Sequence, residues 1–422
     1  MKNSGVEWIG EIPDDWWVSQ VKNIFSIGRG RVIAQTELSE HGLYPVYSSQ
    51  TKDNGCLGYI NTYDFDVKQL TWTTDGANAG TVFLREGKHN CTNVCGTLQL
   101  KNHENILGYQ KYALEFLTEY YKRSDTNGYK IMNNEMAKII TIIPPKATQQ
   151  KIASYLDKKC SKIEETIQNQ KQVIEKLKAY KQTLITEAVT GKVKIENGKA
   201  CGMYEEYKDS GVEYLGSIPQ NWNVKRLRYI GKCQNGISKG GEFFGSGYPF
   251  VSYGDVYNNL VLPETVAGLI ESTPGEQENY SVKAGDIFFT RTSETIEEVG
   301  FTSVCLKTIE NATFAGFVIR VRPFTEDLLP GFSKYYFSSD AHRRFFVKEM
   351  NLVTRASLGQ GLLKRLPVLL PSKDEQKNIA DYLDKKCLVI NNTIEKKHKL
   401  IEKLTEYKKS LIHECVTGKK EI

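Results

Sequence analysis

Residues that could do chemistry occur in two short stretches of the sequence, and each stretch lacks a necessary part. Phe243-Phe-Gly-Ser-Gly247 fits the F-x-G-x-G pattern with which adenine methyltransferases bind their cofactor, but the partner pattern (Asn/Asp)-Pro-Pro-(Tyr/Phe) is absent from the sequence. His89, Cys91 and Cys95 offer imidazole and thiol ligands for zinc, but a second ligand pair with suitable spacing is missing. We therefore expect buried free thiols and no metal here.

The sequence also lacks the parts of a nuclease or an ATP motor. Asp374-Glu-Gln-Lys377 contains the Glu-x-Lys fragment of a nuclease signature, but no Pro-Asp lies suitably upstream, and the acids suit a helix N-terminus. No Gly-x-x-x-x-Gly-Lys-(Ser/Thr) loop, which would cradle phosphates, occurs. The sequence thus predicts no catalytic residue and no cofactor bound by this chain.

Many of the remaining polar side chains suit contact with DNA. Base reading needs hydrogen-bond donors and acceptors on short, rigid loops, and Arg, Lys, Asn, Gln, Ser and Thr supply them. The alternative for each candidate is a plain turn or surface role. We predict DNA contacts from two regions: Arg29, Arg31, Lys52, Thr73, Thr74, Asn78, Lys130 and Asn133 in the first, and Ser238, Lys239, Ser252, Tyr253, Arg291, Thr292, Arg355, Ser357 and Gln360 in the second.

A tandem duplication frames these two regions. Asn3-Ser-Gly-Val-Glu-Trp-Ile-Gly-Glu-Ile-Pro-Asp-Asp-Trp16 recurs as Asp209-Ser-Gly-Val-Glu-Tyr-Leu-Gly-Ser-Ile-Pro-Gln-Asn-Trp222. Residues 147–192 recur as 374–419, with 25 of 46 positions identical, whereas the middles show little similarity to each other. Duplication followed by drift is the alternative, but drift should blur all parts alike. Shared ends therefore indicate a common docking task, and dissimilar middles indicate two recognition tasks.

The repeat also sets the predicted domain boundaries. Both middle regions contain short β-branched and aromatic runs separated by Gly and Asn turns, with helical patterns between them, so the expected class is α+β. The predicted parts are a first domain at 1–146 (arm 3–24, variable part 25–141), a helix at 147–192, a linker at 193–208, a second domain at 209–371 (arm 209–230, variable part 231–368) and a helix at 372–422.

The repeated C-terminal segments predict two long helices. Apolar residues recur at heptad spacing, Ser372-x-x-Glu375 is a capping box, and Gly191 and Gly418 are natural stops. An isolated helix of this kind would leave its apolar seam in water, so we expect an antiparallel pair; packing of each helix on its own domain is the alternative. The predicted pairing residues are Ile163, Ile167, Ile174, Leu177, Leu184, Ile390, Ile394, Ile401, Leu404 and Leu411.

Composition suits a soluble protein of two domains. The 422 residues are 40% hydrophobic and 25% charged, with a net charge of +6. Residues 146–194 and 372–422 together hold 23 Lys and 14 acidic residues, so the basic charge gathers in the predicted helices. The nine cysteines form no disulfide framework, the sequence starts without an apolar signal core, and no apolar run could span a membrane. We expect a cytoplasmic protein.

Taken together, the repeated motifs resemble one known family. The arms share Gly-Val-Glu-(Trp/Tyr)-(Ile/Leu)-Gly-x-Ile-Pro-x-x-Trp, and the helices begin with Pro-(Pro/Ser)-x-x-x-x-Gln…Ile-Ala-x-Tyr-Leu-Asp. The helices end as Glu187-Ala-Val-Thr-Gly-Lys192 and Glu414-Cys-Val-Thr-Gly-Lys419. In duplicate, and over essentially the whole length, these motifs are similar to those of the specificity subunits of type I restriction–modification enzymes.

The resemblance implies a division of labour. Each variable part would be a target-recognition domain that reads one half of an asymmetric, bipartite site in double-stranded DNA, and the helices would set the spacer. The arms and helices would dock two modification subunits, which bind S-adenosylmethionine, and two restriction subunits, which use ATP and Mg. The alternatives are a stand-alone adenine DNA methyltransferase and a coiled-coil adaptor that binds only proteins.

Overall fold

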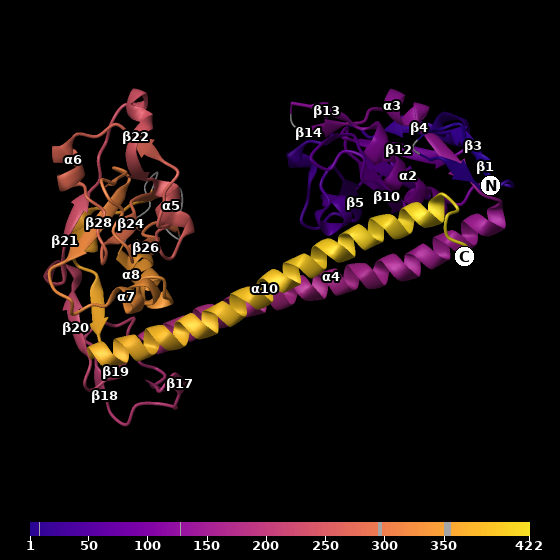
Figure 1. Ribbon diagram of the computed structural model, residues 1–422. Helices are drawn as coiled ribbons and strands as arrows, with labels where there is room; N and C mark the ends of the chain where they lie inside the picture. Colours follow the sequence, from indigo (N-terminus) through magenta and orange to yellow (C-terminus); the bar gives the residue numbers. More distant parts are fainter. Residues whose placement is uncertain (8, 127, 294–297, 350–355) are drawn as a thin grey trace. The chain divides into compact units, whose positions relative to one another are not determined.

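The computed structural model describes residues 1–422 apart from 8, 127, 294–297 and 350–355 (Figure 1). The chain folds into two compact units. Unit 1 comprises Met1–Lys171 and Lys397–Ile422, and unit 2 comprises Gln172–Lys396. Each unit therefore contains one variable domain and one stretch of each long helix. The predicted α+β class with internal duplication is confirmed.

Unit 1 contains a main sheet covered on one side by a helix. The main sheet has the order β10-β8-β12-β4, and helix α2 packs on β8 and β10. Its elements are β1 (Lys2–Asn3), β2 (Glu11–Ile12), β3 (Trp17–Gln20), α1 (Val21–Ile24), β4 (Phe25–Arg29), β5 (Tyr44–Tyr47), β6 (Cys56–Ile60), β7 (Phe65–Asp66), β8 (Gln69–Thr73), β9 (Asp75–Gly76), β10 (Val82–Arg85), β11 (Lys88–Cys91), β12 (Cys95–Leu100), α2 (Leu107–Tyr121), β13 (Arg123–Asp125), β14 (Gly128–Lys130), α3 (Asn133–Lys138) and β15 (Ile140–Ile143).

Unit 2 has the same main-sheet topology although its sequence differs. The order β26-β24-β28-β21 corresponds to β10-β8-β12-β4, and in both units a parallel pair, β5–β11 or β22–β27, starts a second sheet. Its elements are β16 (Ile195–Glu196), β17 (Lys199–Ala200), β18 (Tyr207–Asp209), β19 (Ser217–Pro219), β20 (Asn223–Arg226), β21 (Gly231–Asn235), β22 (Phe244–Val251), α5 (Tyr253–Asn258), β23 (Leu269–Ile270), α6 (Pro274–Asn279), β24 (Ile287–Thr290), β25 (Thr292–Ser293), β26 (Thr302–Val304), β27 (Thr313–Phe314), β28 (Val318–Pro323), α7 (Pro330–Tyr336), α8 (Asp340–Glu349), β29 (Ala356–Ser357), α9 (Gln360–Leu363) and β30 (Pro367–Leu370).

The two long helices are α4 (Lys146–Val189) and α10 (Lys373–Val416). The predicted capping box at the start of α10 is present, because Glu375 N donates to Ser372 Oγ at 3.3 Å and Ser372 N donates to Glu375 Oε2 at 3.2 Å. Both helices end where a glycine takes a left-handed backbone, with φ of +71° at Gly191 and +72° at Gly418. A side chain is strained in that conformation, so glycine terminates each helix at low cost.

Within each unit the helices run antiparallel, as predicted (Figure 1). In unit 1, Lys408 Nζ lies 2.7 Å from Glu164 Oε1, and Lys397 Nζ lies 2.8 Å from Gln170 Oε1. In unit 2, Lys181 Nζ lies 3.0 Å from Asn391 Oδ1. Of the predicted pairing residues, Ile163, Ile174, Ile390 and Leu411 are buried, and Ile167, Leu177, Leu184, Ile394, Ile401 and Leu404 are partly buried.

Residues repeated in both helices fasten each variable domain to its helix. Gln149 Oε1 accepts a hydrogen bond from Ile106 N at 2.9 Å, and Gln376 Oε1 accepts one from Leu329 N at 2.8 Å. Asp157 accepts from Tyr112 Oη at 2.8 Å, and Asp384 accepts in the same way from Tyr335 Oη at 2.6 Å. Identity between the repeats at these four helix positions is thus explained by the same bonds made twice.

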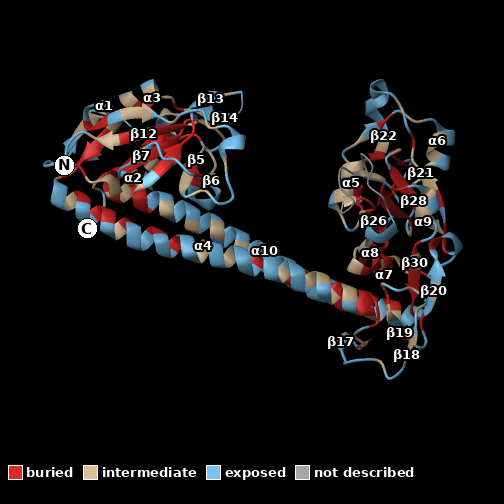
Figure 2. Cartoon of the chain, turned by 180° about the vertical axis from the view of Figure 1, so that it is seen from behind, coloured by how far each residue is buried: buried red, intermediate tan, exposed pale blue. Residues whose placement is uncertain are grey.

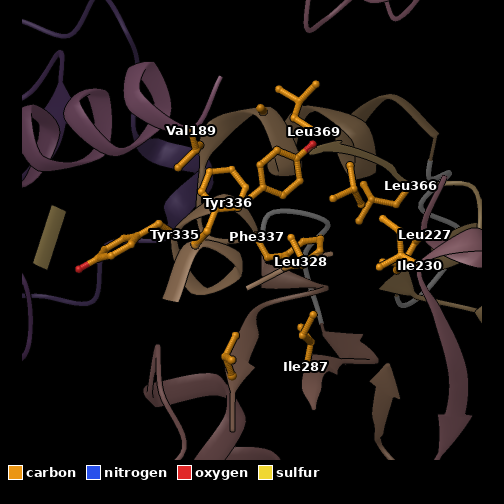
Figure 3. Packing of buried hydrophobic residues seen from close by; sticks show 14 of the residues in the cluster. Val189, Leu227, Ile230, Ile287, Leu328, Tyr335, Tyr336, Phe337, Leu366 and Leu369 are labelled. Carbon is orange, nitrogen blue, oxygen red and sulfur yellow. The ribbon is translucent and has the colours of Figure 1, made fainter. Parts of the chain in front are cut away.

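Each arm packs on the end of the helix that comes from the other copy. In unit 1, Ile9, Ile12 and Trp16 pack with Leu411 and Val416 of α10. In unit 2, Leu215, Ile218 and Trp222 pack with Ile185 and Val189 of α4, and burial is dense at this end of the helix (Figure 2). Val189 lies close to Tyr336 in this core (Figure 3). The two helix ends are therefore integral parts of the cores that they reach.

Two local features depart from the expectations. The predicted linker contains a hairpin, β16–β17, in which Asn197 (φ 48°) and Gly198 (φ 71°) form the turn. An Asn-Gly pair favours such a turn, so the sequence carried the signal. Residues 327–349, whose amphipathic pattern predicts a single helical stretch, form two helices, α7 and α8, because the backbone turns at Phe337–Ser339.

Candidate nucleic-acid interface

Loops at one end of the main sheet bring several predicted DNA-contacting residues of unit 1 together. Strands β4 and β8 both pair antiparallel with β12, so they run parallel and their C-terminal ends meet at the same edge. Arg29 ends β4, Thr74 follows β8, and Asn133 begins α3 beside them. Asn133 Nδ2 donates to Gly28 O at 3.1 Å, and Arg29 Nη2 lies 3.5 Å from Thr74 Oγ1.

Arg29 is the exposed member of this group. Its Nε donates to the backbone carbonyl of Asn93, which fixes the side chain, and the residue as a whole is exposed. Thr73 and Thr74 do not fit the prediction as well, because both are fully buried and their hydroxyls donate to the backbone carbonyls of Asn78 and Val94. Such hydroxyls stabilise the loop and cannot reach a base unless it opens.

The other candidates of unit 1 lie farther out. Arg31 pairs with Glu37 at 3.0 Å and with Asp64 at 3.2 Å, and the hydrogen bond to Glu37 is the main reason that the pKa of Arg31 rises. Lys130 pairs with Asp125 at 2.9 Å. Lys52 and Asn78 are exposed; Lys52 precedes Asp53 and Asn54, which have left-handed φ values of 49° and 53°, and Asn78 Nδ2 donates to Ser49 O at 3.4 Å.

In unit 2 the corresponding sheet edge carries Arg291, Thr292, Ser357 and Gln360. Thr292 and Ser357 face each other in the β25–β29 pair, and Gln360 Nε2 donates to Asn235 Oδ1 at 2.9 Å. The side chain of Arg291 is partly exposed and makes no hydrogen bond to a described residue. Arg355 lies outside the described residues.

The remaining candidates of unit 2 have structural partners. Lys239 Nζ bonds Glu276 Oε2 and Glu271 O, both at 2.8 Å. Ser252 caps helix α5, and Tyr253 Oη donates to Thr292 O at 2.9 Å. Ser238 is exposed. Tyr253 thus connects helix α5 to the strand that follows Arg291.

Sequence reasoning missed Asn235 and two buried arginines. Asn235 is the position of unit 2 that corresponds to Arg29, and the match between Gly30 and Gly236 could have found it. Arg85 is 2% exposed, and its guanidinium lies 3.5 Å from the ring centre of Tyr47; Arg320 is 4% exposed and donates to Ser281 O and Gln234 Oε1. Burial lowers the pKa of Arg85 and lowers that of Arg320 to about 10. Arginine is usually a surface residue, so its type alone gave no signal.

The thiols and imidazoles have protein partners or apolar surroundings. His89 Nε2 lies 2.8 Å from Gln69 Nε2, and burial raises the pKa of Cys95 to about 11 and that of Cys91 further. Among the described residues, no cluster of three or more His, Cys, Asp or Glu side chains could hold a metal ion. None of the described helices is both long and apolar enough to cross a membrane.

Two α+β domains on long antiparallel helices, with exposed polar loops at one sheet edge of each, define a duplicated DNA-binding protein. The family model of the type I restriction modification DNA specificity domain matches residues 13–179 and again residues 219–406. The chain therefore belongs to the family of type I restriction–modification specificity proteins.

Individual relatives agree with this assignment. A type I specificity subunit N-terminus from Mycoplasma pneumoniae is 40% identical over 139 residues, which are 33% of this chain and 74% of that relative. The MjaVIII type I specificity subunit of Methanocaldococcus jannaschii is 26% identical over 97% of this chain and 93% of that relative. Other M. pneumoniae relatives are spanned over only 38% to 63% of their lengths.

One solved structure has the same fold. It is described as the structural basis underlying complex assembly and conformational transition of the type I R-M system. Its TM-score is 0.70 at 13% identity, and the match covers 96% of this chain and 98% of that one.

Proposed function

We propose that the chain reads a bipartite, asymmetric DNA site, with one variable domain on each half, and docks the subunits that carry out catalysis. The observation that carries this proposal is the contrast between the two copies. Their sheets have the same topology and their helices share surface residues, yet their loops present different side chains. A protein that recognises two different half-sites and docks the same kind of partner at each copy needs this combination.

The recognition part rests on loop chemistry. In unit 1 the sheet edge presents Arg29, whereas in unit 2 it presents Asn235, Arg291 and Gln360. Arg suits guanine and Asn or Gln suits adenine in the major groove, so different sets favour different half-sites. The basic helices add charge that attracts the phosphate backbone.

The docking part rests on residues that are identical between the repeats and exposed in both. On the helices and just after them, and apart from Asp157 and Asp384, this set includes Lys158 and Lys385, Lys159 and Lys386, Glu175 and Glu402, Lys176 and Lys403, Tyr180 and Tyr407, and Lys192 and Lys419. Tyr180 is 56% exposed and Tyr407 is 52% exposed, so core packing does not account for them. We infer that one kind of partner binds at two equivalent surfaces, one on each unit.

Catalysis would lie in these partners. We propose two modification subunits, which bring S-adenosylmethionine, and two restriction subunits, which use ATP and Mg, on a chain that binds no cofactor itself and works in the cytoplasm. This division is supported by the sheet edges, where the polar groups of the described residues bond neighbouring groups or are exposed, and none of those described forms a nucleophile–base pair.

The first test exchanges one variable domain. Residues 25–141 are replaced by the variable part of another specificity protein. Tyr109 and Tyr112 are kept, because the Tyr109 hydroxyl donates to Val416 O at 3.3 Å and the Tyr112 hydroxyl donates to Asp157 Oδ1 at 2.8 Å. The chain is expressed with its modification subunit in a host without other adenine methyltransferases, and methylated DNA is sequenced. We expect methyladenine in a split motif, with only one half changed by the exchange.

Other outcomes would contradict the proposal in distinct ways. A change in both halves would contradict the assignment of one domain to each half. A continuous motif would contradict the bipartite site. Methylation by the chain alone would favour a stand-alone methyltransferase, and a soluble complex that binds and methylates no DNA would favour a protein adaptor.

A second test concerns the docking surfaces. We expect Tyr180→Ala and Tyr407→Ala each to remove one bound modification subunit, and the double variant to remove both, with an affinity loss of about 30-fold at each surface, because exposed tyrosines often dominate interfaces. Mass photometry of the purified complex counts the subunits. Tyr229→Ala is the matched control, because Tyr229 is 63% exposed but not repeated. If the double variant retained two modification subunits, the assignment of this docking surface would be wrong.

A further inference from the structure

The dissimilar variable domains can be aligned residue by residue through their backbone hydrogen bonds. Parallel bridges join Arg31 to Thr92 in unit 1 and Ile237 to Ala315 in unit 2. One position before each bridge stands a glycine, Gly30 or Gly236, whose added Cβ would lie 2.1 Å from a carbonyl oxygen of the facing strand. The position before the glycine is Arg29 in unit 1 and Asn235 in unit 2, so these two residues are equivalent.

A second set of bonds aligns the neighbouring loops. Ile131 N donates to Thr74 O at 2.8 Å, and Leu358 N donates to Arg291 O at 2.7 Å. Thr74 N and Arg291 N in turn donate to the facing strand, to Val94 O at 3.1 Å and Phe317 O at 2.9 Å. Thr74 is therefore equivalent to Arg291. Asn133 and Gln360, which stand two residues after the two donors, are equivalent as well.

These three equivalent positions adjoin one another. In unit 1 the first position adjoins the second, because Arg29 Nη2 lies 3.5 Å from Thr74 Oγ1. The third position adjoins the first, because Asn133 Nδ2 donates to the carbonyl of Gly28, the residue before Arg29, at 3.1 Å. In unit 2 the first and third are linked by the 2.9 Å bond from Gln360 to Asn235. Each unit has one arginine in its cluster, but at different positions.

We propose that this cluster determines sequence specificity in each domain, and that its guanidinium, from Arg29 in unit 1 and Arg291 in unit 2, reads a guanine in the corresponding half-site. The proposal rests on the proposed function and adds to it the residues that recognise one base in each half. Because positions 29 and 74 lie side by side in unit 1, an arginine at either equivalent position could deliver its guanidinium to the same region of the groove.

The geometry of both arginines suits this task. The Nε of Arg29 is held by the carbonyl of Asn93, which orients the guanidinium and leaves further N–H groups to donate. Arg291 is partly exposed, and its backbone is fixed on both sides, because its N donates to Phe317 O at 2.9 Å and its O accepts from Leu358 N at 2.7 Å. Guanine presents two acceptors, O6 and N7, in the major groove, and the fork of arginine matches them.

The cluster in unit 2 presents an additional pair of groups. Gln360 Nε2 donates to Asn235 Oδ1, and the two other amide atoms, the acceptor Gln360 Oε1 and the donor Asn235 Nδ2, bond none of the described residues. Adenine presents the complementary acceptor and donor at N7 and N6. In unit 1 the amide of Asn133 is used differently, since its Nδ2 binds the backbone and its Oδ1 is buried. Asn133 is therefore a positioning residue, not a base reader.

The test replaces each arginine in the complete complex with the modification subunit. Arg29→Gln should relax the methylated motif at one G·C pair of one half, and Arg291→Gln should relax it at one G·C pair of the other half. Purified complexes are also titrated with duplexes in which each base pair of the motif is substituted in turn. Preference for guanine at the affected pair should fall roughly 5- to 100-fold, with other positions unchanged.

Matched control variants distinguish the loss of base recognition from the loss of a positive charge. Arg31→Gln removes the same charge two residues after Arg29, but its guanidinium is bound by Glu37 and Asp64 and its equivalent, Ile237, cannot donate. Arg228→Gln is the control for unit 2, because Arg228 is exposed, lies outside the cluster and bonds Tyr229 Oη at 2.8 Å. Neither control should change the preference at any base pair, and any loss of affinity should be the same for all sequences.

The outcomes keep the two proposals distinguishable. If the unaltered complex methylates no bipartite motif, the proposed function fails. If it does, but Arg29→Gln and Arg291→Gln leave every base preference intact, relax a position other than a G·C pair, or affect both halves equally, the cluster proposal fails alone. The titration measures the base preference even where a variant methylates DNA too slowly for the motif to be sequenced. The melting temperature of the variant shows whether it is folded.

Discussion

Replacing Trp222 by Ala should destabilise unit 2 by about 3–5 kcal/mol, and replacing Trp16 by Ala should do the same to unit 1. Trp222 is completely buried, and Trp16 is 5% exposed. Each ring packs beside the glycine that ends a helix, since a Cβ on Gly191 or Gly418 would lie 3.3 Å from the indole. Removal of either ring would therefore open a cavity where an arm meets the end of a long helix.

Amide hydrogen exchange is measured at increasing urea concentrations and analysed separately for the peptides of each unit. Exchange in unit 2 should accelerate in the Trp222 variant and exchange in unit 1 in the Trp16 variant. Loss of protection in neither unit would show that the arms do not contribute to the cores.

A milder substitution distinguishes the two sites. Trp222 Nε1 donates to Glu375 Oε1 at 3.2 Å, whereas the residue of the first helix equivalent to Glu375 is Thr148, and the indole of Trp16 donates to no described residue. Trp222→Phe should therefore cost about 1.5–3 kcal/mol more than Trp16→Phe, because it leaves a charged acceptor without this donor. Equal costs would show that the bond to Glu375 adds no net stability.

Helices and caps could be predicted from sequence because their signals are local. Heptad spacing, the Ser372-x-x-Glu375 capping box and the terminal glycines act within a few residues of one another, and α4 and α10 begin and end close to them. The antiparallel pairing followed from the duplication, since each apolar seam needed a partner.

The candidate recognition surface could be predicted only in part. Residue type suggested Arg29, Arg291 and Gln360, which the structure places at a sheet edge, but it also suggested Thr73 and Thr74, whose hydroxyls donate to backbone carbonyls. Whether a polar side chain faces solvent or the backbone depends on loop geometry, which type does not encode. The equivalence of Thr74 with Arg291 was not visible, because it is carried by backbone pairing between unlike sequences.

Shortening both helices by one heptad should change the spacer of the DNA site. Residues 168–174 and 395–401 are equivalent in the two repeats, and removing both preserves the heptad seam. Seven residues of helix span about 10 Å, which corresponds to roughly three base pairs of DNA. We expect methylation of the original motif to be lost and any remaining methylation to fall on a motif with a spacer about three base pairs shorter.

The twist of DNA about its axis adds a second expectation to this prediction. Three base pairs turn DNA by roughly 100°, whereas removing one heptad turns the helix pair by only about 20°, so distance and orientation cannot both be restored. Methylation of the shortened motif should therefore be slower than that of the original by the unaltered complex. Removal of 168–174 alone is the control, because the seams then differ in length and assembly should fail. Full methylation at the original spacing by the doubly shortened chain would show that the helices do not set the spacer.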